Sequence, residues 1–265
     1  MRKILVILMI MTFALTGYAF EDEPEAREIM QKVQDRDDGD DITSDMKMIL
    51  IDKNGSERVR DMRSFSKDKG EDTMQLMFFT SPADVKDTGF LTYDYDDPDK
   101  DDDQWLYLPA LKKTKRIASD DKSGSFMGSD FNYSDMTERE LPDWRFRIIK
   151  EMNVKGEDVW VIEAEAVSEA VADETGYSKS YLFIRKDNYT LTRAVHWENT
   201  GGDMKYLDVI KMEKIDGIWM NREVHMTKKS GNVTKHKTVM KIDNIKLYQD
   251  LSEDMFTIRR LEKGL

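Results

Sequence analysis

The chain of 265 residues carries 53 Asp and Glu against 41 Lys and Arg, so its formal net charge is −12. This acidic balance argues against a nucleic-acid-binding protein, whose affinity rests on Lys and Arg that neutralise phosphates. The chain has no cysteine, which excludes disulfides, thiol catalysis and Cys-ligated metal sites. A hydrophobic fraction of 39% supplies the core of one large domain.

The first residues have the pattern of a secretory signal peptide. Two basic residues precede the apolar run Ile4–Leu15, and small residues follow at Gly17 and Ala19. The run is shorter than the ~20 residues that a membrane-spanning helix needs. We therefore expect cleavage after Ala19, at the end of a signal peptide of residues 1–19. The mature chain, residues 20–265, is expected to be one exported domain without stable membrane insertion.

One helix and then a long series of strands are predicted for the mature chain. After Pro24, apolar residues recur at Ala26, Ile29, Met30 and Val33, which is the spacing of one helical face. The pattern then changes to the two-residue alternation of strands, first up to residue 118 and again from residue 145 to residue 242, with short turns between them. Such a meander predicts one highly curved antiparallel sheet of about eleven strands, open or closed into a barrel.

Three segments interrupt this series. The acidic stretch Asp94–Asp103 has the alternating carboxylates of a calcium loop but lacks the glycine of loop position 6, and Leu108 stands where the bidentate Glu belongs. We therefore interpret it as a solvated loop. The second segment, Ser119–Trp144, sets large apolar residues in a polar connection. The third, Ser168–Thr175, precedes Gly176 and fits either a loop or a short helix.

Candidate catalytic groups are few. All three His lie in predicted strands, and a turn at 230–231 would place His225 opposite His236 in the last hairpin. No third ligand is evident, so we expect two imidazoles on the solvated face and no metal site. The sequence contains no G-x-S-x-G elbow, P-loop, G-x-G-x-x-G or H-E-x-x-H motif. We therefore expect a protein without enzymatic activity and without a cofactor.

Apolar and aromatic residues stand out in two segments. Residues 104–111 combine two aromatic residues and three leucines around a proline, and residues 125–133 hold large apolar side chains in a glycine-containing connection. Such side chains either cap the core or line a ligand cavity beneath a movable flap, with Trp105 and Tyr107 on the wall below. In the flap hypothesis Gly128 supplies a hinge or a positive-φ turn, and Asp130 caps a short helix.

Three spaced motifs carry a family resemblance. They are SPADVKDTGFL from Ser81, QWLYLPALKKTKRI from Gln104 and SFMGSDFNYSDM from Ser125. With them, the stretch from Phe78 to Asp135 resembles the LolA-like outer-membrane lipoprotein-sorting proteins. The opening helix and the downstream strands are similar to that family as well, so the resemblance covers nearly the whole mature chain.

This resemblance implies a fold that is mainly β within the α+β class, a half-open antiparallel β-barrel with an N-terminal helix and a short helical or loop lid. LolA shields the acyl chains of lipoproteins that cross the periplasm of Gram-negative-type envelopes. The resemblance implies a periplasmic, monomeric carrier of lipoprotein acyl chains or other lipids, working with an inner-membrane RND-type exporter or an ABC-type releasing complex. The alternative is a sensor or accessory subunit of an RND-type export complex, with the cavity as a docking surface.

The site residues also follow from the resemblance and from the apolar segments. The arginine that locks the lid of empty LolA has no matching position in this sequence. The expected lipid-binding residues are Phe78, Phe90, Trp105, Tyr107, Leu108, Phe126, Met127, Phe131 and Tyr133.

Overall fold

The computed structural model describes residues 20–265, and the expected signal peptide lies outside the described residues. The strands are β1 Ile42–Asp52, β2 Glu57–Lys69, β3 Asp72–Ser81, β4 Gly89–Asp94, β5 Asp103–Leu108, β6 Lys113–Arg116, β7 Trp144–Val154, β8 Glu157–Ala166, β9 Tyr177–Arg185, β10 Leu191–Glu198, β11 Met204–Ile215, β12 Ile218–Ser230 and β13 Val233–Lys246. The helices are α1 Pro24–Gln34, α2 Glu169–Thr175 and α3 Ile258–Lys263. Short 3-10 turns lie at Pro109–Leu111, Ser119–Asp121, Phe126–Gly128, Tyr133–Met136, Leu141–Asp143 and Glu253–Met255.

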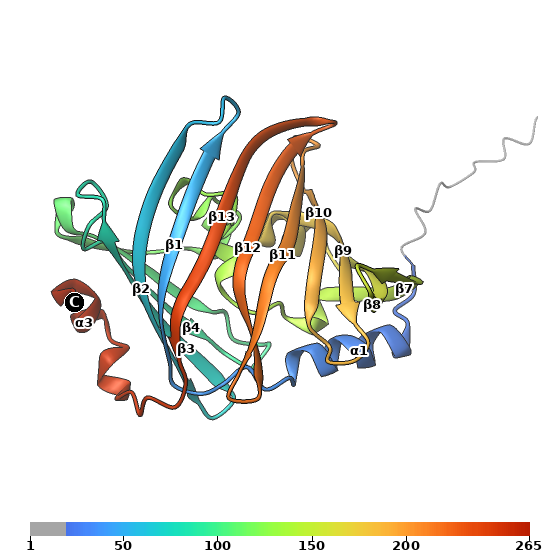
Figure 1. Ribbon diagram of the computed structural model, residues 1–265, viewed down its shortest axis with the longest axis horizontal. Coiled ribbons are helices and arrows are strands. Elements are labelled where there is room, and N and C mark those ends of the chain that lie inside the picture. Colours follow the sequence, from blue (N-terminus) through green and yellow to red (C-terminus); the bar gives the residue numbers. More distant parts are fainter. Residues whose placement is uncertain (1–19) are drawn as a thin grey trace, which may run out of the picture.

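All thirteen strands belong to one antiparallel sheet, in the order β6-β5-β4-β3-β2-β1-β13-β12-β11-β10-β9-β8-β7. Consecutive strands pair throughout, except that β6 and β7 do not pair and form the two free edges of the sheet. The first and last strands, β1 and β13, also pair with each other. Figure 1 shows the sheet curling strongly, with α1 running below β9 and β10. The predicted class, a highly curved open antiparallel sheet, is confirmed, with thirteen strands where about eleven were expected.

Helix α1 is the predicted amphipathic helix. Pro24 stands in its first turn, and Ala26, Ile29 and Met30 are buried, as the periodicity predicted. These side chains join an apolar cluster with Phe146 of β7 and other residues of β8–β10. The helix therefore covers the inner face of one half of the sheet.

The other half of the sheet is filled by the connection between β6 and β7, residues 117–143. Phe126 and Phe131 of this connection pack against apolar side chains from β1 to β5, β12 and β13, such as Met48 and Met240. Because one cluster gathers side chains from strands on both sides of β1, it lies inside the curl. We call residues 117–136 of this connection the lid segment.

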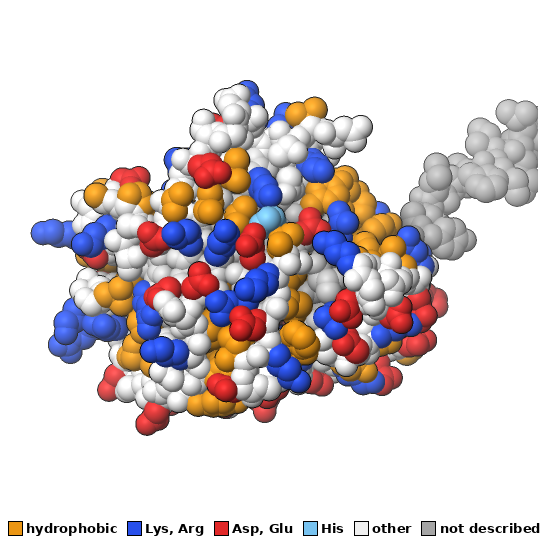
Figure 2. All heavy atoms as spheres, in the orientation of Figure 1, with side chains coloured by type: hydrophobic (Ala, Val, Ile, Leu, Met, Phe, Trp, Pro, Cys, Tyr) orange, Lys and Arg blue, Asp and Glu red, His pale blue; other side chains and the backbone are white. Residues whose placement is uncertain are grey.

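The outer face is covered differently in its two parts. Over β1 and β11–β13, Figure 2 shows Lys, Arg, Asp and Glu side chains interspersed, which is the solvated face that the alternation predicted. On the outside of β3–β5, the C-terminal segment covers an apolar cluster that includes Phe256 and Leu261. Within residues 20–265, no helix is both long and apolar enough to span a membrane.

The last hairpin has a different register from the predicted one. His236 lies opposite Lys228, and His225 lies opposite Val239. The turn closes between Ser230 and Val233, and a bulge after Lys228 shifts the pairing further. The two His are therefore not neighbours: Nε2 of His225 lies 2.7 Å from a carboxylate oxygen of Glu223, within its own strand.

The segment that fitted either a loop or a short helix is a helix, α2. The Ser168 hydroxyl accepts a hydrogen bond from the backbone N–H of Val171 and so caps its N-terminus. Gly176 ends the helix with a φ of +82°, the left-handed conformation that favours glycine.

Candidate functional site

A cavity of about 330 Å³ lies inside the curl, between the end of the β6–β7 connection and strands β9–β11. A second cavity of about 240 Å³ adjoins it and shares several of its lining residues, among them Met30 and Val33 of α1. Much of the wall is therefore apolar. It is built from the helices α1 and α2, the β4–β5 loop, the strands β7 and β9–β11, and the connection. Its apolar residues include Met30, Val33, Trp144, Leu182, Ile184 and Leu207.

Most of the predicted lipid-binding residues are gathered on the inner face. Phe90, Leu108, Phe126, Met127, Phe131 and Tyr133 belong to one apolar cluster. The ring of Phe126 lies 5.1 Å from that of Phe90 and 5.6 Å from that of Tyr133, and Phe126 is fully buried. Phe131 lines the cavity. The Phe126 side chain of the lid segment therefore belongs to the core, and the Phe131 side chain lies at the boundary between core and cavity.

Three of the predicted residues lie on the opposite face of the sheet. Phe78, Trp105 and Tyr107 pack in the outer cluster with Phe256 and Leu261 of the C-terminal segment. The expectation that Trp105 and Tyr107 form a wall below the flap is therefore wrong. The physical reason is that successive side chains on a strand point to opposite faces of the sheet, so Trp105 and Tyr107 lie on the face opposite that of Leu106 and Leu108.

The lid segment turns sharply at Met127 and Gly128. Gly128 has a φ of +74° with open space at its Cβ position, and Met127 itself has a φ of +50°. The backbone carbonyl of Met127 accepts a hydrogen bond from Nη1 of Arg60 on β2. Burial lowers the pKa of Arg60. One half-buried arginine therefore ties the turn of the lid segment to the sheet.

Arg60 was missed by the sequence analysis, although the sequence contained a signal for it. Arg60 lies two residues before Met62, which is buried inside the curl. Side chains two residues apart on a strand share a face, so Arg60 is a charged residue on the core-facing side of β2.

The expectation that Asp130 caps a helix is also wrong. Its carboxylate accepts a hydrogen bond of 2.7 Å from the hydroxyl of Thr238 and lies 2.7 Å from Nδ1 of His236. Both partners belong to β13, so the carboxylate contacts this strand and not a helix N-terminus. The helical turn at Tyr133–Met136 is capped instead by Asn132, in a capping box with Asp135. Asp130 therefore anchors the lid segment to β13.

A polar network forms the inner end of the cavity. Asp135 accepts hydrogen bonds from the Tyr177 hydroxyl, at 2.9 Å, and from the backbone N–H of Asn132. The Lys205 ammonium donates to the Asn132 side chain at 2.6 Å. The ring of His196 stacks on that of Tyr177, and burial lowers the pKa of His196 well below its usual range, so its imidazole is neutral.

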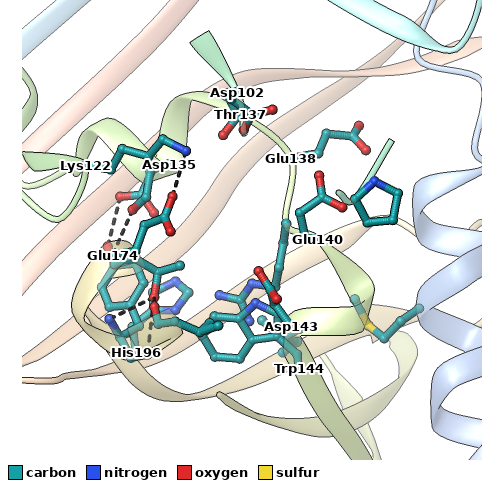
Figure 3. Close-up of a pocket in the computed structure, with 18 of the residues that line it drawn as sticks. Asp102, Lys122, Asp135, Thr137, Glu138, Glu140, Asp143, Trp144, Glu174 and His196 are labelled. Atoms are coloured by element: carbon teal, nitrogen blue, oxygen red, sulfur yellow. Dashed lines mark hydrogen bonds and ion pairs between the residues drawn. The ribbon is translucent and has the colours of Figure 1, made fainter. Parts of the chain in front are cut away.

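Arg139 is the cation of the cavity wall that approaches this network. Its Nη2 donates to the Ser180 hydroxyl at 3.2 Å, and its guanidinium carbon lies 3.9 Å from the centre of the Trp144 ring. Burial lowers the pKa of Arg139 to about 10, against the attraction of Asp135. At pH 7 the side chain is still charged. Figure 3 shows Trp144 and His196 at the opposite side of the cavity from Glu138.

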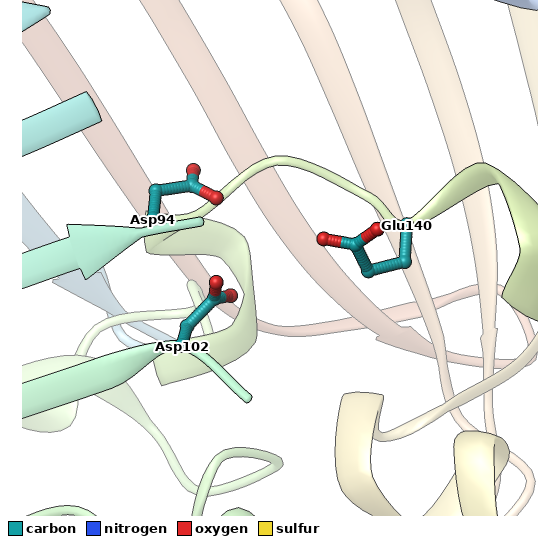
Figure 4. Close-up of side chains that lie close together, drawn as sticks. All are labelled: Asp94, Asp102 and Glu140. Carbon is teal, nitrogen blue, oxygen red and sulfur yellow. The ribbon is translucent and has the colours of Figure 1, made fainter. Parts of the chain in front are cut away.

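Carboxylates gather at the outer end of the cavity. An acidic cleft of about 270 Å³ is lined by Asp38, Asp68, Asp94, Asp96, Glu138 and Glu140 together with Arg36. Asp94, Asp102 and Glu140 turn their carboxylates toward one another, with oxygens within 4.8 Å (Figure 4). Burial raises the pKa of Asp94 to about 8 and that of Glu140 to about 7, and like-charged neighbours add to both shifts.

This arrangement modifies the prediction of a solvated loop at Asp94–Asp103. The central residues Asp97, Asp99 and Asp101 are exposed, as predicted, whereas Asp102 is buried. The later part of the loop, Pro98 and Lys100 to Asp102, lines the cavity, whereas Asp94 at its start lines the acidic cleft.

Comparisons with known proteins agree with this architecture. A family model described as an uncharacterized protein matches residues 71–263. A crystal structure of an outer membrane lipoprotein-sorting protein domain from Vibrio parahaemolyticus is 32% identical, with a TM-score of 0.80 over 90% of this chain and 98% of that one. A DUF1329 family protein from Desulfovibrio piger is 27% identical, with a TM-score of 0.82 over 91% of this chain and 100% of that one.

A more distant structure shares the fold. The LolA superfamily protein from Nitrosomonas europaea has a TM-score of 0.67 at 18% identity, over 89% of this chain and 98% of that chain. No curated protein matches the chain. The fold is thus that of the LolA superfamily protein, with an internal cavity. The chain belongs to the LolA-like family of outer-membrane lipoprotein-sorting proteins.

Proposed function

We propose that the mature chain, residues 20–265, is a single domain that shelters the acyl chains of lipoproteins or related amphipathic lipids and carries them through the periplasm towards the outer membrane. The observation that carries this proposal is the cavity of about 330 Å³ with its largely apolar wall inside the curl. Each methylene removed from water contributes about 0.8 kcal/mol, so a long chain gains much from this shelter. Flexible side chains such as Met30 allow chains of different shape to fit.

The same geometry supports binding without catalysis. Ser180 Oγ lies 2.8 Å from Nδ1 of His196, which is the one serine–histidine contact at the cavity in the described part of the chain. Ser180 is fully buried, and its hydroxyl also accepts the hydrogen bond from Arg139. A substrate carbonyl has no access to that oxygen, so we propose that the pair is structural.

The test is native mass spectrometry of protein purified from the periplasm without detergent. Val33→Trp places a larger side chain in both cavities and so reduces their volume, whereas Glu25→Trp places the same side chain on an exposed position of α1. We expect bound lipid in the wild type and in Glu25→Trp, and its loss in Val33→Trp. The mature protein should begin at Phe20. A mass without lipid, with no uptake of added lipoprotein or phospholipid, would overturn the proposal.

A further inference from the structure

Arg139 lies between Glu138 and Glu140, and all three residues line the cavity. Its neighbours Glu138 and Glu140 both line the acidic cleft. Arg139 instead contacts Ser180 of β9 and the ring of Trp144. Lys122 of the connection also lines the cavity, but its ammonium forms an ion pair with Glu174 at 2.7 Å, whereas Arg139 has no ion pair among the described residues.

The guanidinium of Arg139 has unused hydrogen-bonding capacity. It has five N–H donors, and it makes one hydrogen bond, to Ser180. Its Nη1 is buried without a partner. No carboxylate of the described residues forms an ion pair with it; Asp135 attracts it from a distance, and that carboxylate is already engaged by Tyr177 and by the Asn132 backbone. A partly buried cation with one buried, unpartnered donor favours an anion from outside the chain.

An apolar track leads away from this cation. Ser180, Leu182 and Ile184 alternate along β9 and so share its inner face, and the two apolar residues line the cavity with Met30 and Val33 of α1. The track from Ser180 to Ile184 is about 13 Å long at the rise of a β-strand. At ~30 Å³ for each water-sized group, the cavity of about 330 Å³ has room for about eleven such groups, which is one chain of medium length rather than three.

We propose that the cavity takes a single-chain amphiphile with a carboxylate headgroup, a medium-chain fatty acid of about ten carbons, with the carboxylate bound to Arg139 and the chain along β9. This inference rests on the proposed function and names the class of lipid that the empty cavity fits. A carboxylate matches the planar guanidinium and forms charge-assisted hydrogen bonds with it. An ester of the same chain length has the same apolar surface and no charge.

The test compares decanoate with its methyl ester, both below the concentration at which they aggregate, by displacement of a hydrophobic dye at pH 7. The wild type should bind the acid about tenfold to one-hundredfold more tightly than the ester. Arg139→Met should remove this preference by weakening the acid alone, and Arg139→Lys should retain part of it. The matched control is Arg259→Met on the exposed surface of α3, which should behave as the wild type does.

The outcomes separate the two proposals. Equal affinity of the wild type for acid and ester would overturn the carboxylate inference and leave lipid binding standing. Binding of neither compound would overturn both. A preference that survives in Arg139→Met would also overturn the inference, because the charge would then be recognised elsewhere. Should Arg139→Met fail to fold, the comparison of acid and ester in the wild type and in Arg139→Lys still decides.

Discussion

Truncation of Phe126 and of Phe131 to alanine distinguishes core from cavity wall within one short segment. Phe126 is fully buried among Phe79, Phe90 and Tyr133. Phe126→Ala leaves a closed void, and such changes cost about 3–5 kcal/mol of unfolding free energy. Phe131 is 8% exposed and lines the cavity, so Phe131→Ala widens an existing space. The transfer of its ring then accounts for most of the cost, about 1.5–3 kcal/mol.

Urea denaturation followed by tryptophan fluorescence gives the two unfolding free energies, and displacement of a bound hydrophobic dye gives the affinity for an acyl chain. We expect the larger loss of stability in Phe126→Ala and the larger loss of affinity in Phe131→Ala. The reasoning would be refuted if Phe131→Ala lost as much stability as Phe126→Ala while binding the acyl chain as tightly as the wild type.

Three further predictions follow from single contacts. Arg60→Met removes the donor to the carbonyl of Met127; stopped-flow measurements should show faster lipid exchange, and the closed lid should lose about 1.5–3 kcal/mol. Gly176→Ala would place a Cβ 2.7 Å from the Asn132 amide at a φ of +82°, and denaturation should show a loss of more than ~1 kcal/mol. Because burial raises the folded-state pKa of Asp94 from 3.8 to about 8, stability should fall as pH rises through that window, and Asp94→Asn should flatten the profile.

The control for the pH prediction is Asp97→Asn, at an exposed position of the same acidic loop. Below pH 4 the Asp94 carboxyl is protonated in the folded and the unfolded state, so it adds no pH dependence there. Between pH 4 and 8 the folded protein holds the additional proton, and its stability declines as that proton is lost. Melting temperatures with the same pH dependence in wild type and Asp94→Asn would contradict this assignment, whereas Asp97→Asn should follow the wild type.

The features that the sequence predicted correctly are those set by neighbours along the chain. The burial of Ala26, Ile29 and Met30 follows from helical spacing alone. The sheet class follows from alternation and turns in the same way. The register of the last hairpin was predicted wrongly because the alternation of apolar and polar residues does not reveal the bulge after Lys228.

Most of the site depends on contacts between distant parts of the chain. Asp130 reaches His236 across 106 residues, and Arg60 reaches Met127 across 67. No local pattern specifies either partner. Trp105 illustrates a different failure: its apolar character was evident, but alternation alone does not state which face of β5 turns toward the lid segment. The acidic mouth was missed because Glu140 lies far in sequence from Asp94 and Asp102.

The lid segment is joined to the two halves of the sheet by separate polar contacts. Arg60 belongs to β2 on one side of β1, whereas Thr238 belongs to β13 and Lys205 to β11 on the other side. Moving the lid segment therefore requires the loss of these directional contacts, each of which is replaceable by water, and also the withdrawal of Phe126 and Phe131 from the apolar core. Arg139 follows on the same connection, so movement of the lid segment also moves the cation that we assign to the headgroup. Release of the chain and release of the headgroup are thus coupled through one stretch of backbone.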